Sequence, residues 1–432
     1  MKVLFLTNEY PPHIYGGAGV HVDYLSRELA KTMEVEVRCF GDQNSLGTNP
    51  AVRGFEVDTA SYTAPKPFHS VFGAVQRCLD FNTDRITADL VHCHTWYSHF
   101  GGILAKLNYG LPLVITVHSL EPLRPWKREQ LGGGYDFSLW VERTALEMAD
   151  AVIAVSNGTK ADIERLFAVK PSRLHVIYNG IDLEEYRPTA RTDALLRYGI
   201  DPAQPYLLFV GRITRQKGIV HLARAIPFMD PGFQIVLCAG APDTPEIAAE
   251  MKAAVSQAQV KRSGVIWIEE MVDKETVHQL YSNAAVFCCP SIYEPFGIIN
   301  LEAMACETAV VASAVGGIKE VVVDGVTGFL VPVEQMSESP FEPLNSEEFE
   351  RDLAARINQL MADPELQKEF GRAGRKRAEE KFGWGAIAGE TMRLYESLCH
   401  PERSGGEVEG SRDETFKITP RDPSTSPLLR SG

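Results

Sequence analysis

The sequence predicts an α/β protein with two doubly wound, Rossmann-like domains, each built on a parallel β-sheet with helices on both faces. Short apolar runs of strand length alternate with segments of helical periodicity along most of the chain. The alternation stops once, in a polar stretch with several prolines, and then restarts. At 432 residues the chain is also too long for a single hydrophobic core. Two such domains in series imply a cleft between them, where ligands tend to bind.

The amino-terminal domain is expected to span residues 1–190. Its first strand is predicted from an apolar run at residues 3–6, and further strands are predicted at 35–40, 90–94, 113–117, 151–155 and 174–178, with helical patterns between them. A glycine-rich loop with Gly16 and Gly17 follows the first strand and leads into a helix at 21–31. Glycines let the backbone approach a phosphate closely, and a helix amino terminus favours anions. A plain strand-to-helix turn explains the same pattern, so the loop alone does not decide between the two.

Polar residues stand at the carboxyl ends of these strands, where parallel sheets bind ligands. His118 directly follows the strand at 113–117 and is the clearest of them. His92, His94 and His99 raise the question of a metal site. No Asp or Glu cluster accompanies them in the sequence, so we expect no metal and interpret His94 as a residue that lines the cleft.

A polar stretch at residues 187–205 is predicted to link the domains. The second domain, 200–383, has expected strands at 206–210, 234–239, 265–268, 285–289 and 308–312, a helix at 218–228 and a helical region at 346–377. An amphipathic pattern at 384–399 predicts a last helix. Residues 400–432 carry few apolar side chains, and we expect them to form a disordered tail.

The turn after the first strand of the second domain carries Arg212, Arg215 and Lys217 in a protein of net charge −14. An exposed basic turn is one explanation. The other is a site for a departing diphosphate, since Arg can fork two phosphate oxygens and Lys adds a point charge. Neutralising a leaving phosphate as it forms stabilises the transition state.

A second turn, around Phe296, Gly297 and Ile298, connects the strand at 285–289 to a helix. The free backbone N–H groups of such a helix start attract anions. Glu294 lies in the turn and Glu302 early in the helix, so carboxylates flank the anion site. A nucleotide sugar fits both features, because it has a diphosphate and many hydroxyls. Alternatively, Glu294 is a loop charge and Glu302 a solvated helix position.

Composition limits the class of protein further. The chain has 43 Lys and Arg residues against 57 Asp and Glu residues. This balance argues against nucleic acids and anionic membranes as partners. No apolar run approaches the length of a membrane span. The eight Cys show no Cys-x-x-Cys spacing, and several lie in strand patterns, as in a cytoplasmic protein with reduced thiols.

Residues 1 to about 398 resemble the retaining glycosyltransferases of the GT-B fold, family 4. The resemblance rests on the loop with Gly16 and Gly17, on His118, on Arg212 with Lys217, and on the Glu294–Glu302 spacing, all in this order. The opening at residues 7–21 and the segment 116–127 resemble the short, actinobacterial type of bacterial glycogen synthase. Longer synthases carry a lysine where Ile14 stands, so the chain resembles them only distantly.

The resemblance implies a role for each of these positions. Gly16, Gly17, Phe296, Gly297 and Ile298 would meet the donor nucleotide sugar. Arg212 and Lys217 would bind the diphosphate and stabilise it as it leaves, and Glu302 would bind the ribose hydroxyls. Glu294 would contact the donor sugar near its anomeric carbon, and His118 would hold that sugar from the first domain. Such enzymes generally need no cofactor and no metal, and their last helix often returns to the first domain.

The sequence therefore predicts a retaining glucosyltransferase that uses ADP-glucose, with UDP-glucose as the other possible donor. The acceptor is either an α-1,4-glucan or glucose 1-phosphate, and the sequence does not separate these two. Transfer of another hexose or mannose is the alternative within the family. A nucleotide-sugar epimerase on the same fold and an inactive glucan-binding protein are the alternatives outside it.

Overall fold

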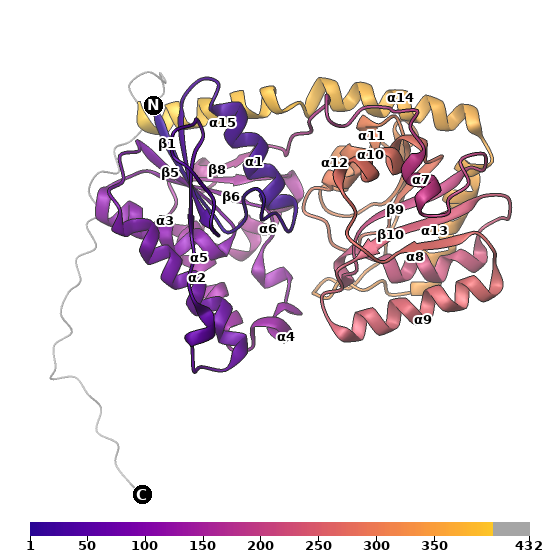
Figure 1. The fold of residues 1–432 in the computed structure, drawn as a ribbon, viewed down its shortest axis with the longest axis horizontal. Helices are drawn as coiled ribbons and strands as arrows, with labels where there is room; N and C mark the ends of the chain where they lie inside the picture. The colour runs from indigo at the N-terminus through magenta and orange to yellow at the C-terminus, as the bar shows by residue number, and fades with distance from the viewer. Residues whose placement is uncertain (401–432) are drawn as a thin grey trace, which may run out of the picture.

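The computed structural model describes residues 1–400, which form two α/β domains side by side (Figure 1). The predicted tail lies outside these residues apart from His400. Each domain is built on one sheet, the first with eight strands and the second with six. The architecture predicted from the alternation of apolar runs and helical segments is confirmed.

The first sheet has the strand order β3-β4-β2-β1-β5-β6-β7-β8 and is parallel except between β3 and β4. Its strands are β1 (Lys2–Thr7), β2 (Glu34–Phe40), β3 (Asn44–Ser45), β4 (Ala51–Phe55), β5 (Leu90–His94), β6 (Leu113–Val117), β7 (Ala151–Ala154) and β8 (Leu174–Val176). The predicted strands are present with ends shifted by one or two residues. The two not predicted, β3 and β4, lie at the sheet edge, where only Val52 is buried, so no apolar run marks them.

Helices cover both faces of the first sheet and connect its strands. They are α1 (Gly17–Leu29), α2 (Lys66–Thr83), α3 (Trp96–Tyr109), α4 (Lys127–Leu131), α5 (Gly134–Met148) and α6 (Asn157–Leu166), with short 3-10 turns η1 (Thr59–Ser61), η2 (Glu121–Leu123) and η3 (Pro171–Arg173). The glycine-rich loop is shorter than expected, because α1 begins at Gly17 rather than at residue 21.

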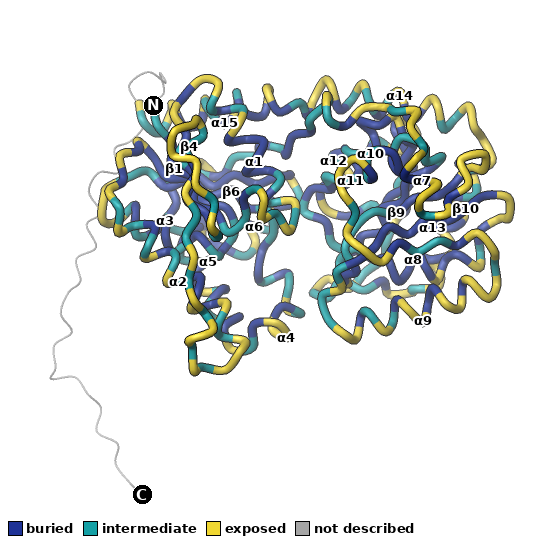
Figure 2. Tube along the Cα trace, in the orientation of Figure 1, coloured by how far each residue is buried: buried dark blue, intermediate teal, exposed yellow. Residues whose placement is uncertain are grey.

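The second sheet has the order β11-β10-β9-β12-β13-β14 and is parallel throughout. Its strands are β9 (Tyr206–Arg212), β10 (Gln234–Gly240), β11 (Val265–Ile268), β12 (Val286–Cys289), β13 (Ala309–Ser313) and β14 (Gly328–Val331). Its helices are α7 (Asp193–Arg197), α8 (Ile219–Ala225), α9 (Pro245–Lys261), α10 (Lys274–Asn283), α11 (Ile298–Ala305), α12 (Ile318–Val321), α13 (Ser346–Met361) and α14 (Pro364–Lys381), with η4 (Arg215–Lys217) and η5 (Ile226–Phe228). Figure 2 shows the strands of both sheets mostly buried and the outer side of α9 exposed.

The predicted linker at residues 187–205 is wrong in part. α7 lies inside it, and Leu195 and Ile200 are almost fully buried in the core of the second domain. Ile181 and Tyr186, which the sequence placed in the first domain, pack in the same core. The prolines and polar residues of this stretch therefore lie on the surface of a packed segment. Its composition did not reveal that Leu195 and Ile200 are buried.

The chain passes between the domains at two points that lie side by side. The backbone N–H of Ile181 donates to the carbonyl of Phe382 at 2.7 Å, and Ile181 also forms an isolated bridge with Gly383. Directly after this point α15 (Trp384–Cys399) runs back along the first domain and packs on α1 (Figure 1). Within residues 1–400, the helices are all too short or too polar to cross a membrane.

Candidate active site

A cavity of about 720 Å³ lies between the two domains. Its volume falls in the range of small-molecule sites. All ten residues singled out from the sequence line it, and they come from four separate segments of the chain: Gly16, Gly17, His118, Arg212, Lys217, Glu294, Phe296, Gly297, Ile298 and Glu302. The tertiary structure thus brings together residues that lie up to 286 positions apart, as the two paired sheets implied.

The glycine-rich loop is held by a carboxylate that the sequence did not single out. Glu9 Oε2 accepts hydrogen bonds from the N–H groups of Tyr15 at 2.8 Å and Gly16 at 2.7 Å. This contact turns the chain into α1 at the carboxyl end of β1. A side chain at Gly17 would lie 3.5 Å from Ile298, so the loop faces the start of α11 in the other domain.

The start of α11 depends on a glycine. Gly297 has φ of +102°, and a Cβ there would come within 2.8 Å of Asn300 Nδ2. Only glycine adopts this conformation at no steric cost. The turn leaves the N–H groups of Ile298 and Ile299 without intrahelical acceptors, and both residues line the cavity.

Glu302 is not a solvated helix position. Its two carboxylate oxygens accept hydrogen bonds from the hydroxyls of Tyr186 at 3.1 Å and Tyr281 at 2.9 Å. Burial raises its pKa, while the two tyrosine hydroxyls act in the opposite direction. The carboxylate is therefore held in one orientation beside the cavity, as a fixed acceptor for hydroxyl groups.

Lys217 and Glu294 form an ion pair on the wall of the second domain. Lys217 Nζ lies 2.6 Å from Glu294 Oε2, and the Ser291 hydroxyl donates to the same oxygen at 3.3 Å. Burial opposes the charge of Lys217, but Glu294 outweighs it, and the pKa of the ammonium is raised. Glu294 is 8% exposed, so it is not a free loop charge.

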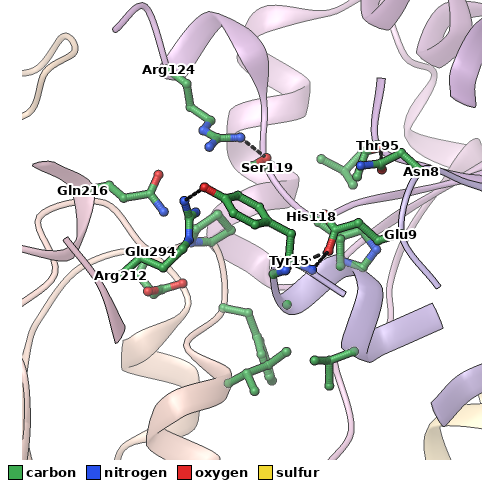
Figure 3. A pocket seen from close by; sticks show the side chains of 18 of the residues that line it. Asn8, Glu9, Tyr15, Thr95, His118, Ser119, Arg124, Arg212, Gln216 and Glu294 are labelled. Atoms are coloured by element: carbon green, nitrogen blue, oxygen red, sulfur yellow. Dashed lines mark hydrogen bonds between the residues drawn. The ribbon is translucent and has the colours of Figure 1, made fainter. Parts of the chain in front are cut away.

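Arg212 completes this wall, and we call Arg212 and Lys217 together the cationic wall. One Arg212 nitrogen donates to Asp243 at 2.8 Å and to the Tyr15 hydroxyl at 3.0 Å, and its guanidinium lies 4.6 Å from the Tyr15 ring centre (Figure 3). Tyr15 thus reaches from the first domain to the second. Arg215, the third cation of the predicted basic turn, does not line the cavity.

His118 enters the cavity from the first domain, backed by other histidines. Its Nε2 lies 3.1 Å from His94 Nδ1, and its ring packs edge-on against His21 with centres 4.7 Å apart. Burial, and then the neighbouring imidazoles, lower the pKa of His118 well below its ordinary value. A neutral imidazole here can hydrogen-bond to a sugar hydroxyl.

The prediction that His94 lines the cleft is wrong. His94 is fully buried behind His118, whereas His99 reaches the cavity. The ring nitrogens of His21, His94 and His118 do lie within 4.8 Å of one another, as three metal ligands would. Two of those nitrogens face each other in a hydrogen bond, and burial lowers the pKa of all three rings. We interpret the cluster as neutral imidazoles that position His118.

The cavity also contains residues that sequence reasoning missed. Polar and charged ones among them include Asn8, Glu9, Tyr15, Thr95, Glu121, Arg124, Lys127, Glu142, Gln216 and Asp243. Two of them had a usable signal, since Asn8 and Thr95 directly follow β1 and β5. Asp243 had no such signal in the sequence, because it matters to the site only through its contact with Arg212.

Two family models match the chain and together cover most of it. The model described as "Glycosyltransferase Family 4" matches residues 15–185, and "Glycosyl transferases group 1" matches residues 193–340. The border between them falls within the segment where the chain passes to the second domain.

Curated relatives align over nearly the whole chain. The alpha-maltose-1-phosphate synthase of Mycolicibacterium smegmatis is 47% identical over 92% of this chain and 100% of its own length. A protein named glycogen synthase in Mycobacterium tuberculosis is 28% identical over 93% of this chain and 96% of its own.

Solved structures share the fold over the same range. Sucrose-phosphate synthase from Thermosynechococcus elongatus superposes with a TM-score of 0.74 at 27% identity and covers 92% of this chain and 99% of its own. Anabaena HepE, solved in complex with UDP-glucose, has a TM-score of 0.70 at 22% identity and covers 92% and 100%. On these similarities, and with two doubly wound domains around one cavity, the chain belongs to the family 4 glycosyltransferases and has the GT-B fold.

Proposed function

We propose that this glycosyltransferase moves glucose from ADP-glucose to glucose 1-phosphate, with retention of the α configuration and release of ADP. The 47% identical relative is named for maltose 1-phosphate, which is a glucose joined by an α-1,4 bond to glucose 1-phosphate. The protein named glycogen synthase is much less similar, at 28% identity, so a glucan acceptor is the weaker alternative.

The observation that carries the proposal is the meeting of the cationic wall with His118 in one cavity. The wall offers positive charge to a diphosphate, and the start of α11 adds backbone N–H groups. Glu302 would accept the ribose hydroxyls, and neutral His118 would hold a hydroxyl of the donor glucose. Anabaena HepE, solved with UDP-glucose, is a precedent for a nucleotide sugar on this fold.

The proposed step is a same-face substitution at C1 of the donor glucose. The C4 oxygen of the acceptor bonds to C1 as the bond between C1 and the diphosphate oxygen breaks. The bonding electrons leave with ADP, and the departing phosphate oxygen takes the proton of the acceptor hydroxyl. Arg212 and Lys217 stabilise the charge that grows on the diphosphate, and Glu294 stabilises the positive charge near C1.

We also propose that the reaction needs no metal ion. Arg212 and Lys217 supply the charge that a divalent cation supplies to phosphates in other transferases. Dialysis against EDTA should therefore leave turnover unchanged. A loss that added Mg²⁺ or Mn²⁺ restores would contradict this assignment.

The test incubates the purified full chain with ADP-glucose or UDP-glucose, each with glucose 1-phosphate or with glycogen. We expect maltose 1-phosphate from ADP-glucose and glucose 1-phosphate, with an α anomeric signal by NMR. Incorporation into glycogen alone would replace the acceptor with a glucan. GDP-mannose serves as a donor control for mannosyl transfer, and release of free sugar without transfer would favour an epimerase.

A further inference from the structure

A second pair of cations lines the cavity, on the wall of the first domain. Arg124 and Lys127 follow β6 at η2 and the start of α4. Figure 3 shows Arg124 reaching toward Ser119, on the side of the cavity across from Gln216 and Arg212. We assign the donor diphosphate to the cationic wall, so Arg124 and Lys127 have no role in binding the donor.

Arg124 is fixed in place but keeps unused donors. One of its terminal nitrogens donates to the Ser119 hydroxyl at 3.1 Å and lies 3.8 Å from Glu121 Oε1. Its side chain is 15% exposed, and its Nε is buried with no hydrogen-bond partner within residues 1–400. An unpaired buried N–H is costly, and a guanidinium presents its donors as a planar fork that matches phosphate.

Lys127 stands beside it, held by the same carboxylate. Its Nζ lies 3.2 Å from Glu121 Oε1, and only 11% of its side chain is exposed. Burial, and then the charge of Arg124, lower the pKa of Lys127. The two cations therefore disfavour each other's charge, although Glu121 pairs with both.

The carboxylates nearby do not balance this charge. Glu121 is ionically paired with both cations, while Glu142 has its pKa raised well above the usual value by burial and by the charge of Glu121. Glu142 Oε2 accepts a hydrogen bond from the backbone N–H of Glu121 at 2.9 Å and forms no ion pair with Arg124 or Lys127. Within residues 1–400, Glu121 is therefore the one carboxylate in ion-pair contact with these two cations, which line the cavity.

From this geometry we infer that Arg124 and Lys127 bind the phosphate of the acceptor, which makes the acceptor a sugar phosphomonoester. The inference rests on the proposed function and deepens it. Ser119, which orients Arg124, directly follows His118, so the phosphate seat adjoins the donor-sugar position. An acceptor whose phosphate is held there can direct the opposite side of its sugar ring, with the C4 hydroxyl, toward C1 of the donor glucose.

The same cluster disfavours a glucan. The end of a glucan chain offers hydroxyls but no negative charge, so it would leave two buried cations with one carboxylate. Covering such a cluster with a neutral ligand costs desolvation energy without a compensating ion pair. A phosphate dianion instead supplies the missing charge and accepts the unused Arg124 donors.

The test compares Arg124→Gln with a matched control, Arg128→Gln. Arg128 lies four residues along the chain on α4, is exposed, pairs with Asp136 and does not line the cavity. We expect Arg124→Gln to raise KM for glucose 1-phosphate by about tenfold or more, the usual effect of losing a hydrogen bond to a charged group. The control should leave KM unchanged, and both variants should bind ADP as the wild type does.

Calorimetric titration of glucose 1-phosphate into the ADP-bound protein separates this inference from the proposed function, because it needs no turnover. Weaker binding to Arg124→Gln but not to Arg128→Gln supports the seat even if the wild type transfers no sugar. Equal binding to all three proteins overturns it while leaving the transferase reaction standing. If Arg124→Gln weakened ADP binding as much as glucose 1-phosphate binding, the inference would also be overturned, because Arg124 would then belong to the donor site.

Glucose 6-phosphate and free glucose provide the last comparison. Binding of glucose 1-phosphate in preference to both supports a phosphate at C1. Preference for glucose 6-phosphate would keep the seat but change the acceptor of the proposed reaction. Equal binding of free glucose would contradict recognition of a phosphate.

Discussion

At the scale of single residues, each cation of the cationic wall is already held by a carboxylate. Lys217 is paired with Glu294 at 2.6 Å, and Arg212 with Asp243 at 2.8 Å. A bound diphosphate must share these cations with their partners. The pairing keeps both side chains aimed at the cavity, and such preorganisation reduces the cost of orienting them as the leaving group departs.

Lys217→Ala should lower turnover by at least about a hundredfold, because the lysine matters most when charge develops on the diphosphate. The substitution also leaves Glu294 buried without its partner, so we expect a lower melting temperature. The double variant Lys217→Ala/Glu294→Gln should recover stability but not turnover. Steady-state kinetics and thermal unfolding measure the two effects separately.

Arg215→Ala is the matched control for Lys217→Ala, since it removes a cation of the same turn that does not line the cavity. We expect its turnover to stay near that of the wild type. A similar loss in both variants would mean that the turn acts through its overall charge, and would remove the specific role of Lys217.

His221, which does not line the cavity, makes stability depend on pH. Burial opposes its charging, but hydrogen bonds to Glu342 and Glu350 raise its pKa to about 9. Arg215 and Arg224 also lie near it. Because the folded pKa exceeds the unfolded one, near 6.5, the charged form stabilises the fold below pH 6.5, and this contribution is lost as pH rises through 9.

Replacing His221 with Gln removes this contribution. The difference in free energy of unfolding between wild type and His221→Gln should reach a few kcal/mol, about 3 at most, at pH 6. It should shrink steadily toward pH 9.5. Urea unfolding midpoints at several pH values measure it, and a difference independent of pH would show that the histidine is neutral throughout.

At the scale of elements, α14 and α15 connect the domains along one side of the molecule (Figure 1). α14 packs on α11 of the second domain, and α15 packs on α1 of the first. Trp384 opens α15, and its ring stacks on Tyr24 with centres 5.6 Å apart and meets His21 edge-on at 5.3 Å. The start of α15 therefore supports the histidines behind His118.

Trp384→Ala should destabilise the protein by about 3 to 5 kcal/mol, as expected for deleting a buried aromatic ring. Trp140→Ala is the control, because that tryptophan is 53% exposed and should cost far less. Denaturant unfolding followed by circular dichroism measures both. Equal effects would indicate that α15 is not part of the cooperative core of the first domain.

At the scale of the whole molecule, the two domains touch beside the cavity. Glu320 of the second domain accepts hydrogen bonds from the backbone N–H groups of Asn157 and Gly158 and from the Tyr178 hydroxyl. The carbonyl of Pro295 accepts from Ser156 at 2.6 Å. These contacts join the amino terminus of α6 to the turns of the second domain. If the domains move relative to each other, we therefore expect the hinge at the two crossings, Ile181 and Gly383, rather than at residues 187–205, which the sequence predicted to link the domains.

ADP-glucose should favour this arrangement over a more open one, because its diphosphate would touch both the glycine-rich loop and the cationic wall. We expect small-angle scattering to show a smaller radius of gyration with ADP-glucose than without. Glu320→Ala should enlarge the radius of the free protein and weaken donor binding. A radius unchanged by saturating donor in both proteins would rule out domain closure, and the chemistry would then proceed in a preformed cavity.

Local patterns in the sequence predicted most of the strands, the glycines at the turns and ten of the residues that line the cavity. Buried parallel strands are nearly continuous runs of apolar residues, so β6, β7 and β12 are visible without a structure. The turn at Gly297 is visible for a similar reason, because its backbone conformation requires glycine. In both cases the information is local, since burial or backbone conformation restricts the residue at that position.

Which of these residues act on one another became visible only in the folded protein. The pairing of Lys217 with Glu294 joins positions 77 apart, and the contact of Tyr15 with Arg212 joins positions 197 apart. Arg124 was not singled out, because an arginine in a loop is ordinarily a solvated charge. It became a candidate phosphate ligand only when the fold placed it on the cavity wall with its Nε buried. Ion pairs and unused donors depend on the distance between side chains that the folded domains bring together, and no periodicity along the chain records that distance.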